Sequence, residues 1–166
     1  CMAFAGSNDI SSLNFYGVNK TCNGFGPGSG GNLFFTDVSF VRFAAGFGGS
    51  GYTGNSRLWN CHANQNDIGI WNFVDSHFYG CEVNANGSGI DMQTGANDNT
   101  FVGIKNEWNT GSNWIFYNNN NNSVLGGVTD RAGTFGFRVT SSTLTVSGTV
   151  VRRSGRNQSS GSAHFF

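Results

Sequence analysis

The amino-acid sequence predicts an all-β fold, a right-handed parallel β-helix of about seven coils, and three observations lead to this prediction. A short motif recurs about every 22 residues along most of the chain. A second motif lies between its copies and recurs at a similar interval. Asn, Ser, Thr and Gly are abundant whereas strong helix formers are scarce, so long helices are not expected.

The first motif is a quartet that starts with a large apolar residue and has Gly, Asp or Asn in third place. Its copies are spaced by 20, 23, 20, 23, 23 and 22 residues and start at Phe15, Phe35, Leu58, Phe78, Phe101, Val124 and Val146. Gly, Asp and Asn tolerate the left-handed backbone conformation better than other residues do. We therefore expect the chain to bend at the third position, with an inward-pointing apolar residue on each side of the bend.

The second motif is a dipeptide whose second residue is apolar. Its copies are spaced by 20, 25 and 22 residues and are Gly69-Ile70, Gly89-Ile90, Trp114-Ile115 and Gly136-Phe137. Two series with the same drifting period indicate an internal repeat. Leucine-rich repeats have a similar period, but their Leu-x-x-Leu-x-Leu frame is absent, and tetratricopeptide and ankyrin repeats are longer and helical. A parallel β-helix fits the period.

In a parallel β-helix, each coil has two or three short strands joined by turns, and successive coils stack about 4.8 Å apart. Equivalent residues lie above one another, so we expect one interior ladder of Phe15, Phe35, Leu58, Phe78 and Phe101. Polar segments such as "YNNNNNS" at 117–123 would form the turns. The β-helix is expected to span residues 1–150, and residues 151–166 to cap its last coil or to lead into a trimerising segment.

Composition excludes several classes of function. The formal net charge is zero and the longest basic run is Arg152-Arg153, so nucleic-acid binding has no electrostatic support. No apolar run is long enough to span a membrane. No signal peptide is visible, and the chain starts at Cys1 rather than Met, so we expect a fragment or a processed piece.

The four cysteines match no zinc-binding spacing, and neither a metal ion nor a cofactor is expected. Cys61 and Cys81 occupy equivalent positions one coil apart. Their separation permits a disulfide, but two stacked, buried free thiols are an equally ordinary arrangement. Glu82 and Lys105 also occupy equivalent positions, and we expect a surface ion pair between them.

Four segments of the sequence resemble coils of the pectin-lyase-like β-helix superfamily. They are "NLFFTDVSF" (32–40), "RLWNCHANQNDIGIW" (57–71), "HFYGCEVNANGSGIDM" (77–92) and "NTFVGIKNEWNTGSNWIF" (99–116). Within that superfamily, the chain looks most like the shaft of a bacteriophage tailspike. Such spikes are usually homotrimers that bind the surface polysaccharide of a host bacterium and often cleave it by hydrolysis or elimination. The resemblance therefore implies an extracellular segment of a virion tail spike that attaches to the host cell.

Two other functions fit the same resemblance. One is a secreted carbohydrate-active β-helix enzyme, such as a lyase, a hydrolase or an epimerase. The other is a structural spike or adhesin shaft without catalytic activity. Whether the chain is an enzyme, in particular a polysaccharide depolymerase, stays open at this point.

Alternation along the strands predicts an outward strip of side chains. If Ile70, Ile90, Ile115 and Phe137 point inward, the residues that follow each of them point outward. Flat aromatic rings stack on the apolar faces of sugars, and polar side chains bond sugar hydroxyls. The expected substrate-binding residues are Trp71, Gln93, Trp114, Phe116 and Arg138. The alternative is that the same strip forms the seam between the chains of a trimer.

Asp91 lies in this strip and is the candidate catalytic residue. Glycoside hydrolysis normally needs two carboxyl groups, about 5 Å apart for retention and about 6.5–9.5 Å for inversion. The column of Asp91 has no second acid, and Asp67 and Asp75 lie one coil away but four positions along the strand. Elimination would instead need a base and a charge neutraliser, and Arg138 is the candidate for the second role.

Overall fold

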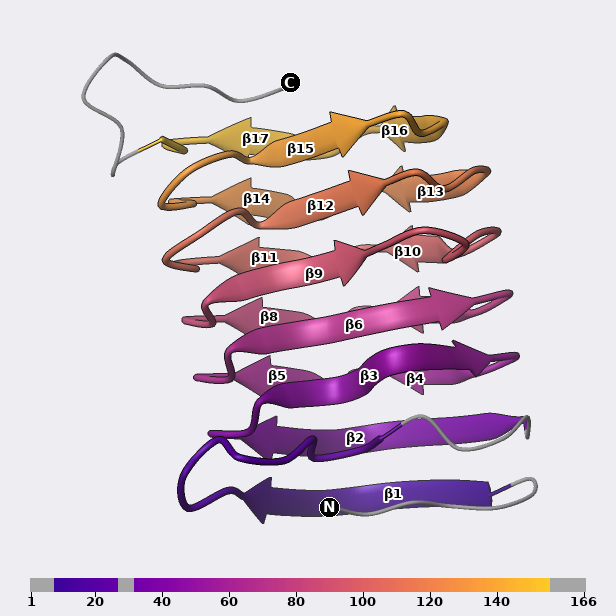
Figure 1. Cartoon of the computed structure of the whole chain (residues 1–166), viewed down its shortest axis with the longest axis vertical. Helices are drawn as coiled ribbons and strands as arrows, with labels where there is room; N and C mark the ends of the chain where they lie inside the picture. Colours follow the sequence, from indigo (N-terminus) through magenta and orange to yellow (C-terminus); the bar gives the residue numbers. More distant parts are fainter. Residues whose placement is uncertain (1–7, 27–31, 156–166) are drawn as a thin grey trace.

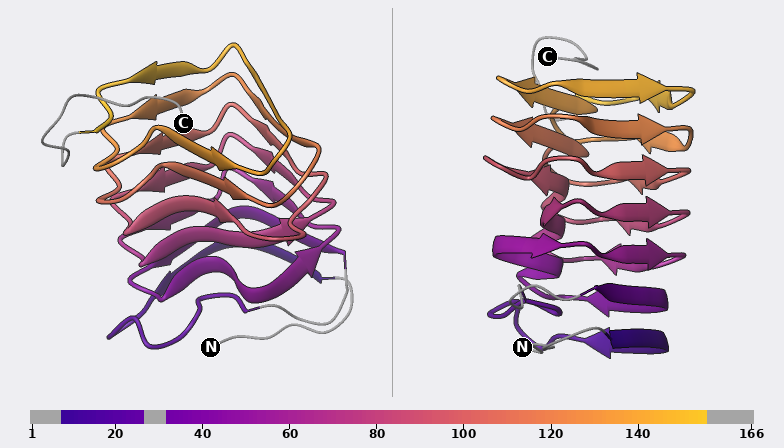
Figure 2. Two further views of the ribbon diagram at one scale, coloured as in Figure 1. Left: turned by 45° about the horizontal axis from the view of Figure 1, so that its top comes forward. Right: turned by 90° about the vertical axis from the view of Figure 1, so that its right-hand side faces the viewer.

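The computed structural model describes residues 8–26 and 32–155, which form a parallel β-solenoid of about six turns with a period of about 23 residues. Figure 1 shows the chain rising steadily from its first strand to its last, and Figure 2 shows the coils stacked along one axis. In Figure 1 the nearer strands run to the right and the more distant strands run to the left while the chain rises, which is a right-handed winding. The predicted all-β parallel solenoid is confirmed.

The strands form two parallel sheets. The smaller sheet has the order β15-β12-β9-β6-β3. Its strands are β3 (Ala45–Gly54), β6 (Ile68–Val74), β9 (Ser88–Met92), β12 (Trp114–Tyr117) and β15 (Phe137–Thr140). The described residues contain no helix, and so no apolar helix of membrane-spanning length.

The larger sheet lies behind the smaller one in Figure 1 and has the order β16-β13-β10-β7-β4-β2-β5-β8-β11-β14-β17, with β1 also paired to β2. Its strands are β1 (Asn8–Tyr16), β2 (Leu33–Val41), β4 (Arg57–Trp59), β5 (His62–Asn64), β7 (His77–Tyr79), β8 (Glu82–Asn84), β10 (Thr100–Val102), β11 (Lys105–Glu107), β13 (Asn122–Leu125), β14 (Val128–Asp130), β16 (Leu144–Ser147) and β17 (Val150–Arg152). The predicted boundary after residue 150 thus falls inside β17, and residues 156–166 lie outside the described residues.

The third residue of the recurring quartet bends the chain as expected. From the second copy onward its φ is positive throughout, at Asp37 (φ 55), Asn60 (φ 51), Gly80 (φ 60), Gly103 (φ 65), Gly126 (φ 67) and Gly148 (φ 66). The bend divides each later coil of the larger sheet into two short strands, whereas β2 runs through it. Because the bend reverses the usual alternation, the first and fourth residues of the quartet both point into the core, as Leu58 and Cys61 do.

The predicted interior ladder exists, but its first rung was assigned wrongly. Phe35, Leu58, Phe78 and Phe101 stack in register, and the rings of Phe78 and Phe101 lie 4.6 Å apart between centroids. Phe15 pairs with Phe40 instead of Phe35, with ring centroids 4.9 Å apart. The reason is that β1 bends at a serine with positive φ (Ser12, φ 54) rather than at the glycine of its quartet.

The interior also contains the two paired cysteines. Cys61 and Cys81 are both buried and both are free thiols. The Sγ of Cys61 lies 3.4 Å from the carbonyl oxygen of Phe35, and the Sγ of Cys81 lies 3.6 Å from that of Leu58. The structure therefore has stacked thiols in place of the alternative disulfide. On the surface, the expected ion pair is present, with Lys105 Nζ 2.7 Å from Glu82 Oε1.

Candidate functional site

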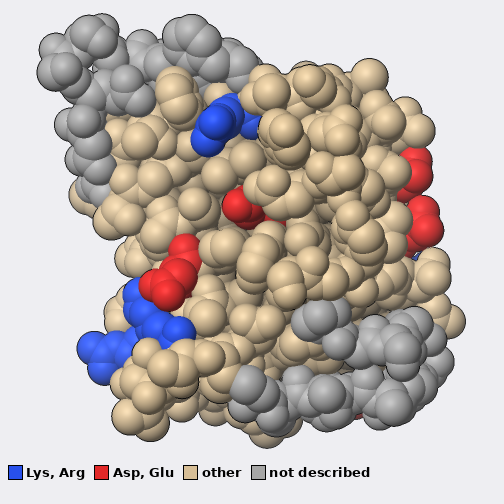
Figure 3. Space-filling model, in the orientation of Figure 1, with Lys and Arg blue, Asp and Glu red and all other residues tan. Residues whose placement is uncertain are grey.

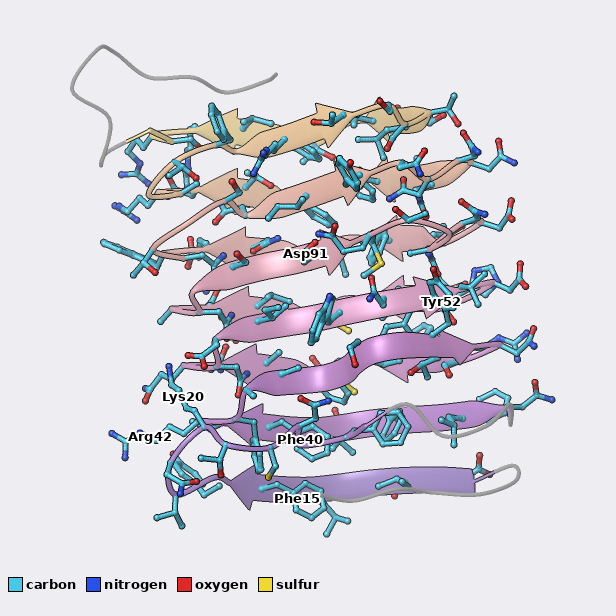
Figure 4. All side chains as sticks on the ribbon, viewed as in Figure 1. Phe15, Lys20, Phe40, Arg42, Tyr52 and Asp91 are labelled. Carbon is cyan, nitrogen blue, oxygen red and sulfur yellow. The ribbon has the colours of Figure 1, made fainter. Side chains whose placement is uncertain are left out.

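The outward side of the smaller sheet forms the candidate site, which we call the front face. Register pairs place Trp71, Asp91, Ile115 and Arg138 in one outward row across β6, β9, β12 and β15. Tyr117 and Thr140 pair in a second row two residues further along, and Gln93, just after β9, lines the same hollow as they do. Figure 4 shows Asp91 near the middle of this sheet. The structure thus brings together Trp71, Asp91, Gln93 and Arg138, as alternation predicted.

Trp114 and Phe116 do not lie on the front face, and their predicted outward position was wrong. Trp114 pairs with Ile90 and Phe137, and both Trp114 and Phe116 are fully buried. Neither ring can therefore stack on a ligand. The prediction aligned Ile115 with the inward isoleucines, one residue out of phase. Burying Trp114 and Phe116 removes more apolar surface from water than burying Ile115 and Tyr117 would.

Tyr117 is the aromatic residue that the sequence reasoning missed on this face. It is 47% exposed, and it lines a hollow of about 230 Å³ together with Gln93, Ile115, Arg138 and Thr140. All four residues of "WIFY" at 114–117 are apolar or aromatic, so alternation fits either phase, and the large Trp114 ring was the signal that could have indicated the inward position.

Tyr52 also belongs to the front face, and it stands on a bulge in β3. Gly48 pairs with Trp71 and Thr53 pairs with Phe73, so residues 49–52 loop out opposite a single residue of β6. The Tyr52 hydroxyl donates a hydrogen bond to the carbonyl oxygen of Thr94, two coils further along the stack. Gly95, which follows Thr94, has a positive φ of 82°, a backbone conformation that favours glycine. Tyr52 therefore spans β6 at one end of the front face (Figure 4).

Asp91 has the least ordinary electrostatic environment on this face. Its burial raises the pKa of the carboxyl group, although the hydrogen bond from the Gln93 amide and the positive charge of Arg138 act in the opposite direction. Gln93 Nε2 donates that hydrogen bond to Asp91 Oδ1. Figure 3 shows acidic atoms near the middle of an otherwise sparsely charged face, where Figure 4 places Asp91. This carboxyl group therefore retains its proton to a higher pH than a solvated aspartate.

The indole N–H of Trp71, the neighbour of Asp91 in the row, is shielded from solvent and has no acceptor among the described residues. Such unsatisfied donors are uncommon in folded proteins and are often found at functional sites.

The front-face rows, within the described residues, contain no second carboxyl group. Asp67 lies elsewhere and forms an ion pair with Lys20 at 3.0 Å. Asp75 lies in the turn before β7 with a positive φ of 51°. Nor does any group of three or more His, Cys, Asp and Glu side chains in the described parts of the chain stand close enough together to bind a metal ion.

Comparison with known proteins adds no family. No protein-family model matches the chain, and no solved structure gives a significant match. The fold and the side chains of the front face are therefore the observations on which a functional proposal can rest.

Proposed function

We propose that the front face binds a polysaccharide and that the chain is a segment of a phage tail spike that recognises the surface polysaccharide of a host bacterium. The observation that carries the binding proposal is the hollow beside Asp91, lined by Tyr117, Ile115, Gln93 and Arg138. The tail-spike setting is supported by the parallel solenoid together with the sequence resemblance described above. A trimer is part of the same proposal.

The chemistry of the hollow suits a sugar unit. Tyr117 and Ile115 offer apolar surface for the ring carbons, and the phenol hydroxyl of Tyr117 can bond to a sugar hydroxyl. Gln93 and Arg138 provide directional donors, and Gln93 also holds Asp91 in place. Pockets of this kind, with apolar walls and a few placed polar groups, are the usual form of small-ligand sites.

The residues of the front face suit one type of polysaccharide cleavage better than another. Two-carboxylate hydrolysis lacks its second group in the described rows. Elimination from an acidic sugar needs a base to remove the proton next to the carboxylate while the glycosidic C–O bond breaks. Asp91 is the candidate base, and Arg138 is the candidate for neutralising the sugar carboxylate. Depolymerisation by elimination, if the chain cleaves its ligand, therefore fits these residues better than hydrolysis does.

The binding proposal is tested with purified capsular and O-antigen polysaccharides immobilised on an array. A polysaccharide that retains the wild-type chain should bind Tyr117→Ala and Arg138→Ala at least about tenfold more weakly, a loss of about 1.4 kcal/mol. Tyr16→Ala is the matched control, because Tyr16 is exposed but lies on β1, away from the front face. Equal binding by all four proteins would reject the front face as the site.

The structural-shaft alternative makes a different prediction for the same variants. If the front face is the seam of a trimer, Tyr117→Ala should lower the molar mass measured by light scattering during gel filtration. A trimer that persists in Tyr117→Ala, combined with lost polysaccharide binding, supports the front face as the polysaccharide-binding site. Loss of the trimer favours the shaft.

A further inference from the structure

We infer that the chain has a second carbohydrate-binding surface on the opposite side of the solenoid, and that it accepts a neutral pyranose polymer. This rear face consists of Phe34, Arg57, Trp59, His77 and Tyr79, which point outward from β2, β4 and β7. Register pairs join Phe34 to Arg57 and Arg57 to His77 in one row, and Trp59 to Tyr79 in the next. Figure 1 shows β4 behind the smaller sheet, and β7 pairs with β4 in the larger sheet, so the rear face is separate from the front face.

The centre of the rear face is an aromatic platform. Trp59 is 59% exposed, and its ring centroid lies 5.1 Å from that of Tyr79, with the planes tilted by 34°. The His77 ring is nearly parallel to that of Tyr79, at an interplanar angle of 14°. Exposed, adjoining aromatic rings on one strip of a protein surface usually mark a binding site.

Three hollows that share lining residues adjoin this platform, and together we call them the groove. One of about 300 Å³ is lined by Thr36, Asp37, Trp59, Asn60, Tyr79 and Gly80. A second of about 540 Å³ shares Trp59 and Tyr79 with the first and also includes Phe34 and Arg57. Arg57 then connects it to a third, of about 420 Å³, beside His77. The three hollows therefore follow one another along the strand direction, and Trp59 and Tyr79 line two of them.

The charges along the groove select the class of ligand. Asp37 lines one end, and Asp75 and Asp98 line the other, whereas Arg57 is the one fixed cation among the residues lining these hollows. A polyanion such as a nucleic acid or a uronate polymer would meet net negative charge there. A neutral sugar would meet aromatic surface for its ring and acceptors and donors for its hydroxyls.

The exposed apolar surface is also small for a protein partner. A stable protein interface buries about 800 Å² on each side around an apolar centre. Trp59 is the one large apolar side chain of the rear face that the structure leaves more than half exposed, and polar side chains flank it closely. A flat sugar ring fits a two-ring platform of this size better than a second protein surface does.

The test follows the indole N–H signals of ¹⁵N-labelled protein by NMR. Trp59 is assigned with Trp59→Phe, and the probes are cellotetraose and β-1,4-galactotetraose, titrated to about 10 mM so that a Kd in the millimolar range is detected. We expect a saturable shift of the Trp59 signal with at least one probe. Tyr79→Ala should weaken that binding at least about fivefold, whereas Tyr16→Ala should not. No shift with either probe, or a shift that Tyr79→Ala leaves unchanged, would overturn the inference.

Two further outcomes separate this inference from the front-face proposal. Tyr117→Ala should leave the Trp59 titration unchanged, because Tyr117 lies on the other sheet; a failure of the front-face proposal would therefore show in the array and not here. A shift of the Trp59 signal on dilution without sugar would instead identify the rear face as a contact between copies of the chain, and would also overturn the inference.

Discussion

Trp114 stacks on Phe137 inside the solenoid, with ring centroids 5.4 Å apart and the two planes parallel. The Trp114 indole N–H donates a hydrogen bond of 2.6 Å to the hydroxyl of Thr129. Three residues later, the same strand directs Tyr117 outward. Strand β12 thus contains one buried aromatic residue, Trp114, and one exposed aromatic residue, Tyr117. Substituting each in turn separates an effect on stability from an effect on the proposed binding.

Trp114→Ala should lower the free energy of unfolding by about 3–5 kcal/mol, because it leaves a cavity and removes a buried hydrogen bond. Tyr117→Ala should change it by less than about 1 kcal/mol, because that ring is half exposed. Urea denaturation followed by far-UV circular dichroism measures both. Similar losses in the two variants would contradict the observed phase of β12.

Asp91→Asn should stabilise the protein at pH 7, raising Tm by about 2–4 °C. The pKa of Asp91 is raised in the fold by burial, so the protonated form is the favoured one. The contribution of protonated Asp91 to the free energy of unfolding is complete below the pKa of an aspartate in the unfolded chain, about 3.9. It is lost as the pH rises through the higher pKa of Asp91 in the folded protein. The gain should therefore vanish below about pH 4. Asp9→Asn, at an exposed position, is the control.

Asp130→Asn should have the opposite effect. The Asp130 side chain is fully buried and contacts Arg131, Arg152 and Arg153. Burial by itself would raise its pKa, but the hydrogen bond from Arg153 and the three positive charges outweigh burial, so the pKa is lowered. The stabilisation by ionised Asp130 is present above the pKa of an aspartate in the unfolded chain, about 3.9. It is lost as the pH falls through the lower pKa of Asp130 in the folded protein. The variant should lose about 2–3 kcal/mol at pH 7 and progressively less as the pH falls below about 3.9, measured by denaturation at each pH.

Asn99→Ala should destabilise the protein by about 2–4 kcal/mol. Asn99 is fully buried in a turn, its Nδ2 donates to the carbonyl of Phe73 at 2.7 Å, and its Oδ1 accepts from the backbone N–H of Ser76 at 3.2 Å. The substitution leaves both backbone groups buried and unpaired. Asn120→Ala, at an exposed position of the next turn, is the matched control. Equal Tm values for the two variants would show that buried asparagines do not hold the coils together.

Ala85→Gly and Gly103→Ala should shift stability in opposite directions, each by about 1 kcal/mol. Both residues have left-handed backbone angles, with φ of 56° and 65°. A Cβ at Gly103 would meet no atom within 4 Å, so Gly103→Ala measures backbone strain without a steric clash. Glycine at position 85 relieves the same strain and should raise Tm. A destabilising Ala85→Gly would mean that unfolded-state entropy outweighs the strain at that corner.

The repeat, the bends and most rungs of the ladder could be predicted from the sequence, because each depends on local requirements. A parallel stack places equivalent residues above one another, so a recurring apolar residue and a recurring Gly, Asp or Asn indicate a coil directly. The prediction failed at β1, where Ser12 adopts an angle that is uncommon for serine. Nothing in the local sequence indicated that bend.

The outward strip could be predicted only in part, because its phase depends on neighbouring coils. Asp91 directly follows the inward residue Ile90, and Arg138 directly follows the inward residue Phe137. Alternation therefore predicted their outward positions correctly. In "WIFY" at 114–117, either alternate pair of residues is apolar enough to point inward. A shift of one residue in the assignment exchanges the inward and the outward pair. Contacts of Trp114 with Phe137 and Phe101 settle the choice. Local sequence does not contain those contacts.

The parallel solenoid follows from the local sequence, because the period and the bending residues act within each coil. Which aromatic residues reach the surface depends instead on how the coils pack on one another. Trp59 is exposed because Leu58 and Cys61 already fill the interior of its coil, and Trp114 is buried because the coils on either side leave space for its ring. The physical reason is that burial is a property of the stack, in which each coil packs against the two beside it.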